Sequence, residues 1–494
     1  MKRIVIIGAG PGGICTGIKL KEAGYNDFII VEQADGVGGT WRHNSYPGSR
    51  CDVPSVLYSF SFAPKRDWST RYALQSEILS YLEDVAEKAG LMPHCRFNTK
   101  VTGAVWNEDS ATWSVNLDSG ETLVGDVVVS GLGLFNKPAY PRLEGLDSFP
   151  GKTMHSARWD HQLDLKGKKV AVIGAGASAI QFIPEIAPDV ADLYVYQRSP
   201  NWVRHWLPDY TPEEREQLMR DPELYRRERH KIWQWIESVC EFSDQKFLAD
   251  STAEGLAILE VVKDPETRAK LTPDFPYGAK RPLTSDYWLP TFNRPNVSLI
   301  ADPIERISGS QIVARDGSRH EVDVIIFGTG FDTSKFLSAI PVTGRDGVRL
   351  EEEWEGGARA YHGISVTGFP NLSMLYGPNT NNGSIIENIE HQVAYAIRHI
   401  KWMEDEGLEW IDIRRAEMDK FNERLQKDLA AIKPWNSGTS TYYFSETGLN
   451  VTQWPHGMEY MARELSRDDK YAYDRSPRAS GQSAPRHDMS SLEA

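Results

Sequence analysis

The chain has 494 residues, more than a single hydrophobic core usually serves, so two or three domains are expected. Its 69 acidic and 55 basic side chains give a net charge of -14, which argues against nucleic acid or an anionic membrane as a partner. The four cysteines lack CxxC or CxxxxC spacing, so neither a zinc site nor a redox dithiol is indicated, and reduced thiols without a metal are expected.

The first predicted element is an apolar strand at residues 4–7 that runs into a glycine-rich turn and a helix. The turn, IGAGPGG, places Gly8, Gly10 and Gly13 in the spacing that lets backbone approach a pyrophosphate at a helix N-terminus. The next predicted strand, FIIVEQ, ends at Glu32. A carboxylate there accepts hydrogen bonds from ribose hydroxyls and repels a 2′-phosphate, so this unit is predicted to bind FAD.

Two further features accompany this unit. The alternating segment WNEDSATWSVNLDSGET, residues 106–122, predicts a hairpin beside the first sheet. A strand at 126–130 leads to Gly131, and a related strand at 322–327 leads to Gly328. Paired glycines at strand ends let the chain pass beneath a flat cofactor, so these are interpreted as crossover points between lobes; ordinary strand-end turns are the alternative.

A second glycine-rich turn, VIGAGASA, follows the apolar strand at residues 170–173. Gly174 and Gly176 repeat the first motif, and Ala179 takes the third glycine's place, as the pattern permits. Arg198 stands as far beyond Gly174 as Glu32 stands beyond Gly8. Its guanidinium can pair with a 2′-phosphate in a bidentate manner, so this unit is predicted to bind NADPH. Three neighbouring polar residues are expected to assist, with the last supporting Arg198: Ser178, Gln181 and Ser199.

Residues 209–275 read as successive helices, with Thr211 as a cap and Pro212 in the first helical position. They predict a helical insertion in the NADPH lobe, and a second helical stretch from about 385 to 406 should return the chain to the FAD lobe. The expected fold is α/β with two Rossmann-like dinucleotide-binding domains and this insertion. The predicted boundaries are as follows: FAD domain, 1–145 and 334–475; NADP domain, 146–208 and 276–333; insertion, 209–275; disordered tail, 476–494.

The location expected for the protein is the cytoplasm. No apolar run approaches the roughly 18 residues of a membrane span, so no membrane partner is predicted. The first strand begins at residue 3, so no signal peptide is expected.

Two longer patterns carry a resemblance to a known family. FPGKTMHSARWD, residues 149–160, fits FxGxxxHxxxW followed by Pro or Asp, and GGTWRHNSYPGSRCD, residues 38–52, fits a second family pattern. The chain thus resembles the type I Baeyer–Villiger monooxygenases, flavoproteins that insert one oxygen of O2 beside a ketone carbonyl. The related N- and S-oxygenating flavin monooxygenases usually have Tyr or Phe where this chain has Trp159 and Asp160.

The resemblance also assigns site residues. In GAKRPLTSDYWLPTFNRPNV, residues 278–297, Lys280 matches the position that binds the 2′-phosphate and Arg281 the position that acts at the flavin, with Asp52 as its ion-pair partner. His155 is assigned to the hinge between lobes rather than to acid–base chemistry. Further cofactor contacts are expected from five residues: Gly39, Thr40, Trp41, Tyr58 and Val101. In KPWNSGTSTYYF only Trp435 and a nearby glycine match the family's mobile loop, and Trp435 is expected to contact NADP.

The function implied by the resemblance is an NADPH- and O2-dependent conversion of a ketone to an ester or lactone through a C4a-peroxyflavin, with possible sulfoxidation, in a monomer or small homo-oligomer. Three alternatives are weighed. Trp159 with Asp160 disfavours an N- or S-oxygenating flavin monooxygenase, and the lack of a suitably spaced cysteine pair disfavours a pyridine-nucleotide disulfide oxidoreductase. A nucleotide sensor without turnover stays open until turnover is measured. An aromatic set that includes Trp202, Trp206 and Trp235 suits either a substrate cavity or plain core, with core favoured.

Overall fold

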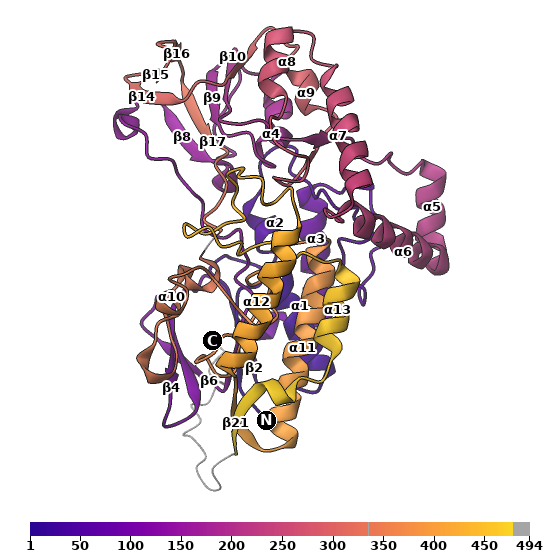
Figure 1. Ribbon diagram of the computed structural model, residues 1–494, viewed down its shortest axis with the longest axis vertical. Coiled ribbons are helices and arrows are strands. Elements are labelled where there is room, and N and C mark those ends of the chain that lie inside the picture. Colours follow the sequence, from indigo (N-terminus) through magenta and orange to yellow (C-terminus); the bar gives the residue numbers. More distant parts are fainter. Residues whose placement is uncertain (334, 478–494) are drawn as a thin grey trace.

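The first lobe is built on a five-stranded parallel sheet in the order β19-β7-β1-β2-β3. A computed structural model describes residues 1–333 and 335–477 (Figure 1). The strands of this sheet are β1 (Ile4–Ile7), β2 (Phe28–Val31), β3 (Cys95–Arg96), β7 (Val127–Ser130) and β19 (Leu372–Met374). The strands β1, β2 and β7 are short and buried along their whole length, as expected where helices cover both faces of a parallel sheet.

Helices α1 (Pro11–Glu22) and α11 (Ile385–Asp405) pack together in this lobe. Helix α1 begins with Pro11 at its first position, where the missing N–H costs nothing. Helix α13 (Met458–Ser466) packs against α11, and α12 (Arg415–Ala431) is joined to α13 by the Arg424–Glu464 ion pair. Further helices outside the insertion include α2 (Thr40–His43), α3 (Gln75–Lys88), α9 (Trp288–Thr291) and α10 (Leu350–Glu353).

The second lobe, at the top of Figure 1, repeats the plan with a parallel sheet in the order β13-β10-β9-β17-β8. Its strands are β8 (Lys152–His155), β9 (Lys169–Ile173), β10 (Asp192–Tyr196), β13 (Val297–Ile300) and β17 (Val324–Phe327). Helix α4 (Ala179–Ile186) follows β9. The α/β class with two Rossmann-like units is therefore confirmed.

Smaller sheets flank both lobes. The predicted hairpin is present as β4 (Val101–Asn107) and β5 (Thr112–Leu117), and it is extended by β6 (Thr122–Gly125) and β18 (Val342–Thr343). Beside the second sheet, three antiparallel strands form a sheet of their own: β14 (Ile304–Ser308), β15 (Gln311–Ala314) and β16 (Arg319–Glu321). A two-stranded parallel pair joins β11 (Val203–Arg204) to β12 (Leu283–Thr284).

Four helices occupy the predicted insertion: α5 (Pro212–Arg220), α6 (Pro222–Val239), α7 (Gln245–Leu259) and α8 (Pro265–Leu271). Thr211 caps α5 in a capping box with Glu214, as its sequence predicted. The assignment of the whole insertion to the NADPH lobe was wrong. Buried side chains of α6, such as Ile232 and Ile236, belong to the hydrophobic core of the first lobe, whereas Leu259 of α7 packs in the core of the second.

The C-terminal part also departs from expectation. Strand β20 (Leu408–Ile413) pairs with β21 (Tyr473–Pro477), so residues 476 and 477, assigned to the tail, belong to a sheet. Backbone pairing fixed this segment despite its polar composition. The rest of the predicted tail, 478–494, lies outside the described residues. Among the helices that the structure describes, none has the length and apolar character needed to cross a membrane.

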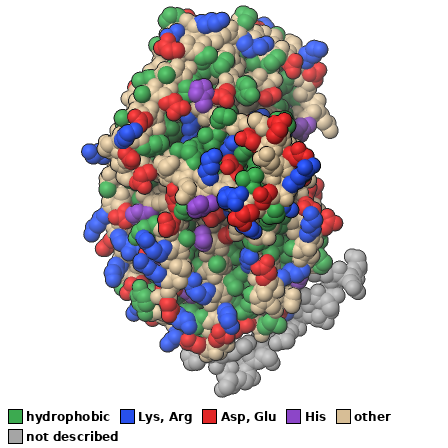
Figure 2. Space-filling model, turned by 90° about the vertical axis from the view of Figure 1, so that its right-hand side faces the viewer, with side chains coloured by type: hydrophobic (Ala, Val, Ile, Leu, Met, Phe, Trp, Pro, Cys, Tyr) green, Lys and Arg blue, Asp and Glu red, His purple; other side chains and the backbone are tan. Residues whose placement is uncertain are grey.

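Surface charge is mixed on the face shown in Figure 2, where acidic and basic side chains are interspersed. On that face the net negative charge is spread out rather than gathered into one patch.

Candidate active site

One cavity of about 1530 Å³ runs between the two lobes and is lined by both glycine-rich turns. It exceeds the usual size of a site for one small ligand, as a site for two dinucleotides requires. Eighteen of the predicted site residues line it: Gly8, Gly10, Glu32, Gly39, Thr40, Trp41, Asp52, Tyr58, Val101, Gly174, Gly176, Ser178, Gln181, Arg198, Ser199, Lys280, Arg281 and Gly328. Gly13, Ala179 and Trp435 do not.

The first glycine-rich turn has glycines at positions where a side chain would clash with the backbone. Gly8 has φ +94°, and a Cβ there would lie 2.9 Å from the carbonyl oxygen of Gly131. Gly13 faces the strand, where a Cβ would lie 1.9 Å from the oxygen of Gly8. Gly13 therefore permits close packing of α1 on β1, the part that the third glycine of the motif plays in forming the nucleotide turn.

Glu32 stands at the end of β2 with a buried carboxylate. Its Oε2 accepts a hydrogen bond from the Ala9 N–H and its Oε1 accepts one from the Ala34 N–H, both at 2.8 Å. A carboxylate oxygen has two lone pairs, so each retains capacity for a ribose hydroxyl. The backbone amides fix the carboxylate beside the glycine turn.

The second turn has the same construction. Gly174 has φ +108°, and a Cβ there would lie 2.3 Å from the oxygen of Gly328, so these two glycines let the turns following β9 and β17 touch. The Ala179 methyl group packs behind them against Gly328 and is fully buried. Ala179 thus packs the helix onto the sheet behind the turn. At Gly176 a Cβ would meet no protein atom within 4 Å, so the surface there is open.

A pair of cations lies at the edge of the second turn. Arg198 is exposed, and Lys280 donates a hydrogen bond from Nζ to Ser199 Oγ at 2.5 Å. Burial and then the charge of Arg198 lower the pKa of Lys280. Two like charges held this close favour an anion between them. Ser199, expected to support Arg198, supports Lys280.

Arg281 and Asp52 form an ion pair across the lobes. Arg281 Nη2 and Nε lie 2.7 and 3.1 Å from Asp52 Oδ2. Burial alone would raise the pKa of Asp52, but the charge and hydrogen bonds of Arg281 outweigh it and lower that pKa. The charge of Asp52 in turn raises the pKa of Arg281. The Arg281 side chain is 39% exposed, so part of its guanidinium faces the cavity as a permanent positive charge.

Trp41 and Tyr58 form an aromatic corner of the cavity wall. Trp41 Nε1 donates a hydrogen bond to Tyr58 Oη at 3.2 Å, and the rings meet edge to face at 5.5 Å. Burial raises the pKa of Tyr58, so its phenol stays neutral at physiological pH. This corner offers two aromatic rings at a steep angle to each other, with the indole N–H and the phenol hydroxyl hydrogen-bonded together.

Gln181 joins the lobes directly. Its Oε1 accepts a hydrogen bond from Tyr46 Oη at 3.0 Å and its Nε2 donates one to the Arg50 carbonyl oxygen at 3.0 Å. Gly48 lies between these partners with φ +74°, and a Cβ there would lie 2.9 Å from the Gln181 carbonyl oxygen. His155, assigned to the hinge, is buried at the end of β8, where its Nδ1 accepts from the Ala157 N–H.

The sequence did not identify Tyr376 or Tyr442, both of which line the cavity. Tyr376 has φ +54°, a strained conformation for a bulky residue. Its hydroxyl donates to Asn381 Oδ1 at 2.7 Å, and Asn381 Nδ2 donates to Gln453 Oε1 at 2.6 Å. Neither the backbone strain nor this buried network has a local sequence signal.

Trp435 is packed away from the cavity. It is 2% exposed and its ring lies 5.6 Å from that of Phe242 and 6.3 Å from that of Tyr443. Apolar packing against the insertion and Tyr443 holds the side chain away from the cavity wall, and its contact with NADP stays a prediction. Of the aromatic residues Trp202, Trp206 and Trp235, none lines the cavity; Trp202 is buried, whereas Trp206 and Trp235 are half-buried.

The cavity has two glycine cradles that a side chain would fill. A carboxylate lies beside the first cradle, and a pair of cations lies beside the second. This arrangement fits two dinucleotides, of which the second bears a 2′-phosphate. Fold and site define an oxidoreductase of the two-nucleotide class. A family model described as "Pyridine nucleotide-disulphide oxidoreductase" matches residues 5–233. All four cysteines are free: Cys15, Cys51, Cys95 and Cys240.

Individual relatives narrow the class. A Baeyer–Villiger monooxygenase of Streptomyces coelicolor is 40% identical over 95% of this chain and 92% of its own length. Cyclohexanone monooxygenase from Rhodococcus sp. Phi1, solved with NADP+, has a TM-score of 0.87 at 30% identity over 96% of this chain and 99% of the other. OTEMO, solved with FAD and NADP, has a TM-score of 0.86 at 27% identity over the same shares. The chain belongs to the Baeyer–Villiger monooxygenase family.

Proposed function

We propose that this protein uses FAD, NADPH and O2 to convert an apolar ketone to an ester or lactone, with Arg281 as the catalytic cation. The observation that carries the proposal is the Arg281–Asp52 ion pair in the wall of a cavity that both glycine turns line. The first turn with Glu32 would hold FAD. The second turn with Arg198 and Lys280 would hold NADPH.

When bound, these cofactors supply reducing equivalents and activate oxygen for insertion beside the carbonyl. The chain's own contribution is electrostatic. The Arg281 guanidinium keeps its charge at working pH, so it stabilises negative charge on oxygen in the cavity without exchanging a proton. Asp52 orients that guanidinium, and because its carboxylate binds Nε and Nη2, the Nη1 group remains for the cavity side.

The test is product analysis with purified protein. We expect a yellow protein that oxidises NADPH faster when a ketone is added and that yields an ester or lactone containing one atom of ¹⁸O from ¹⁸O2. A protein that stays colourless after incubation with FAD would contradict the cofactor assignment. Oxygenation of amines and sulfides with no reaction on a panel of ketones would favour the N- or S-oxygenating alternative.

The proposal extends to cellular location and oligomeric state. We infer a cytoplasmic protein that is a monomer or small homo-oligomer. Size-exclusion chromatography with light scattering measures the second property, and an assembly above a tetramer would contradict it.

A further inference from the structure

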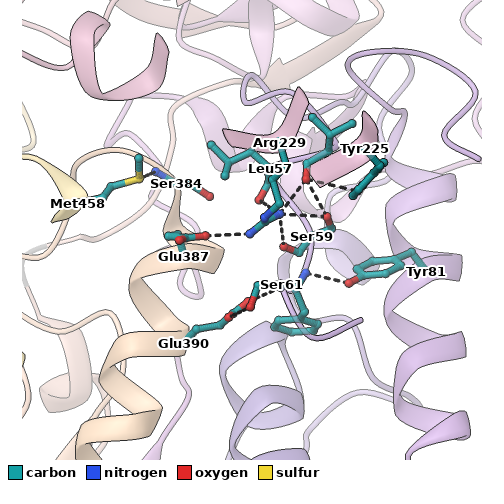
Figure 3. Close-up of polar contacts among 12 residues, drawn as sticks. Leu57, Ser59, Ser61, Tyr81, Tyr225, Arg229, Ser384, Glu387, Glu390 and Met458 are labelled. Atoms are coloured by element: carbon teal, nitrogen blue, oxygen red, sulfur yellow. Dashed lines mark hydrogen bonds and ion pairs between the residues drawn. The ribbon is translucent and has the colours of Figure 1, made fainter. Parts of the chain in front are cut away.

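A buried polar cluster joins the helical insertion to the first lobe (Figure 3). At its centre is Arg229 of α6. Nη1 of Arg229 donates to the carbonyl oxygens of Val56, Leu57 and Ser59 at 2.7, 3.2 and 3.0 Å. Nη2 donates to Glu387 Oε2 at 2.8 Å, and the two side chains are 15% and 19% exposed. One guanidinium thus binds a loop and a helix from distant parts of the chain.

The loop that Arg229 binds carries Tyr58. The carbonyl oxygens at positions 56, 57 and 59 bracket this residue, whose ring lines the cavity against Trp41. Beyond Ser59 the same loop is tied to α11, because the Ser61 N–H donates to Glu390 Oε1 at 2.7 Å. Its conformation is therefore set from the side facing away from the cavity.

Helix α11 presents different residues to the cluster and to the cavity. Glu387 and Glu390 face the loop in Figure 3, whereas Ile385, Ile386 and Ile389 line the cavity. Tyr58 lines the same cavity as these isoleucines. Tyr58 and Asp52 of the ion pair described above belong to the same loop segment, and both line this cavity.

The chemistry of the cluster requires arginine. Four acceptors arranged around one side chain match the planar, multi-donor guanidinium, whereas a lysine ammonium has three donors on a single atom and cannot span them. The contact is also remote from Arg198 and Lys280 in the other lobe, so a change at Arg229 should leave the NADPH contacts intact.

We propose that Arg229 is a positioning residue for the apolar half of the ketone site. By fixing the loop around Tyr58 and the first turn of α11, it shapes the wall against which the hydrocarbon part of the ketone packs and from which water is excluded. This inference rests on the proposed function and adds that the substrate carries its apolar part beside Tyr58, Ile386 and Ile389.

The first test compares Arg229→Lys with Arg226→Lys, an exposed arginine of the same helix paired with Glu223. For Arg229→Lys we expect the ketone KM to rise about tenfold and more NADPH to be consumed with release of hydrogen peroxide, with the NADPH KM unchanged. Arg226→Lys should match the wild type. An unchanged ketone KM and peroxide yield in Arg229→Lys would overturn the proposal.

A second test separates positioning from stability. Arg229→Met strands the buried Glu387 carboxylate and should lower the apparent melting temperature, and adding Glu387→Leu should restore much of it by removing that charge. The loop carbonyls remain unbound in the double variant, so we expect its ketone KM to stay raised. A KM that recovers together with the melting temperature would assign Arg229 a purely structural role. If the wild type itself yields no ester, the proposed function fails, and the comparison of Arg229 variants does not decide that question.

Discussion

Arg281 donates two hydrogen bonds to a single oxygen of Asp52, although 229 residues separate them in the sequence. The pair fixes one edge of the guanidinium and leaves the other edge toward the cavity. The two lobes must therefore keep their relative position for this charge to stay in place.

Replacement of Arg281 should separate the two halves of the reaction. In Arg281→Ala we expect anaerobic bleaching of the flavin by NADPH to proceed normally, because the NADPH contacts are intact. Ester formation should fall by at least about a hundredfold, as when an oxyanion-stabilising donor is lost. Stopped-flow absorbance and product analysis measure the two halves. A normal ester yield would remove Arg281 from the mechanism, and Asp52→Asn, which keeps the shape but not the charge, serves as the matched comparison.

Replacement of Arg198 should reduce the preference for NADPH over NADH. Arg198→Ala is expected to raise the NADPH KM while barely changing that for NADH, so the preference falls by about tenfold to a hundredfold. The reason is loss of one of two cations that face each other across the second turn. Steady-state kinetics with both nucleotides give the ratio. If the preference is unchanged, Lys280 carries the recognition of the phosphate.

Two glycines of the nucleotide turns should respond differently to the same methyl group. Gly13→Ala brings a Cβ to 1.9 Å from backbone, so it should cost about 1–3 kcal/mol of stability and reduce FAD content. Gly176→Ala meets no protein atom, so its thermal stability should stay within about 0.5 kcal/mol of the wild type while the NADPH KM rises. Thermal unfolding and flavin absorbance distinguish them; equal stability of both variants would contradict the packing role of Gly13.

Asp412 on β20 should make stability depend on pH near neutrality. Burial raises the pKa of Asp412 from 3.8 to about 7, although the hydrogen bond from the Gly368 N–H and the charge of Arg345 both act to lower it. Because the folded state holds the proton more tightly than the unfolded state, the stabilising contribution is complete below pH 3.8 and is lost as the pH rises through about 7. Relative to Asp412→Asn, the free energy of unfolding of the wild type should therefore fall by on the order of a few kcal/mol between pH 4 and 7. Above pH 7 the two curves of unfolding free energy against pH should run parallel. Urea unfolding at several pH values checks this; parallel curves throughout would contradict it.

The sequence predicted those parts of the fold and site that depend on local chemistry. The glycine turns, the strand-end Glu32 and Arg198, and the capped helix at Thr211 each have a fixed local spacing, and all appear where expected. The Arg281–Asp52 pair was expected only through the family resemblance, since no spacing rule links residues so far apart.

The remaining features depend on tertiary packing. Trp435 followed a family pattern but is buried against Phe242, and α6 followed the second lobe in sequence but packs on the first. Tyr376 reaches the cavity through a left-handed backbone that nothing in its neighbourhood encodes. In the sequence, Arg229 is one of several charged residues of an amphipathic helix, and only the structure shows the carbonyl groups that it binds.

The contact between the lobes should be sensitive to any side chain added at Gly48. Gly48 packs tightly in that contact, with the Gln181 backbone and the Glu185 side chain both less than 3 Å from where a first side-chain carbon would sit. A single added carbon at this point would act as a spacer between the halves, widening the separation of the two nucleotide cradles and with it the path that electrons must travel. The transfer rate is therefore expected to respond to a substitution at a position outside the cavity wall.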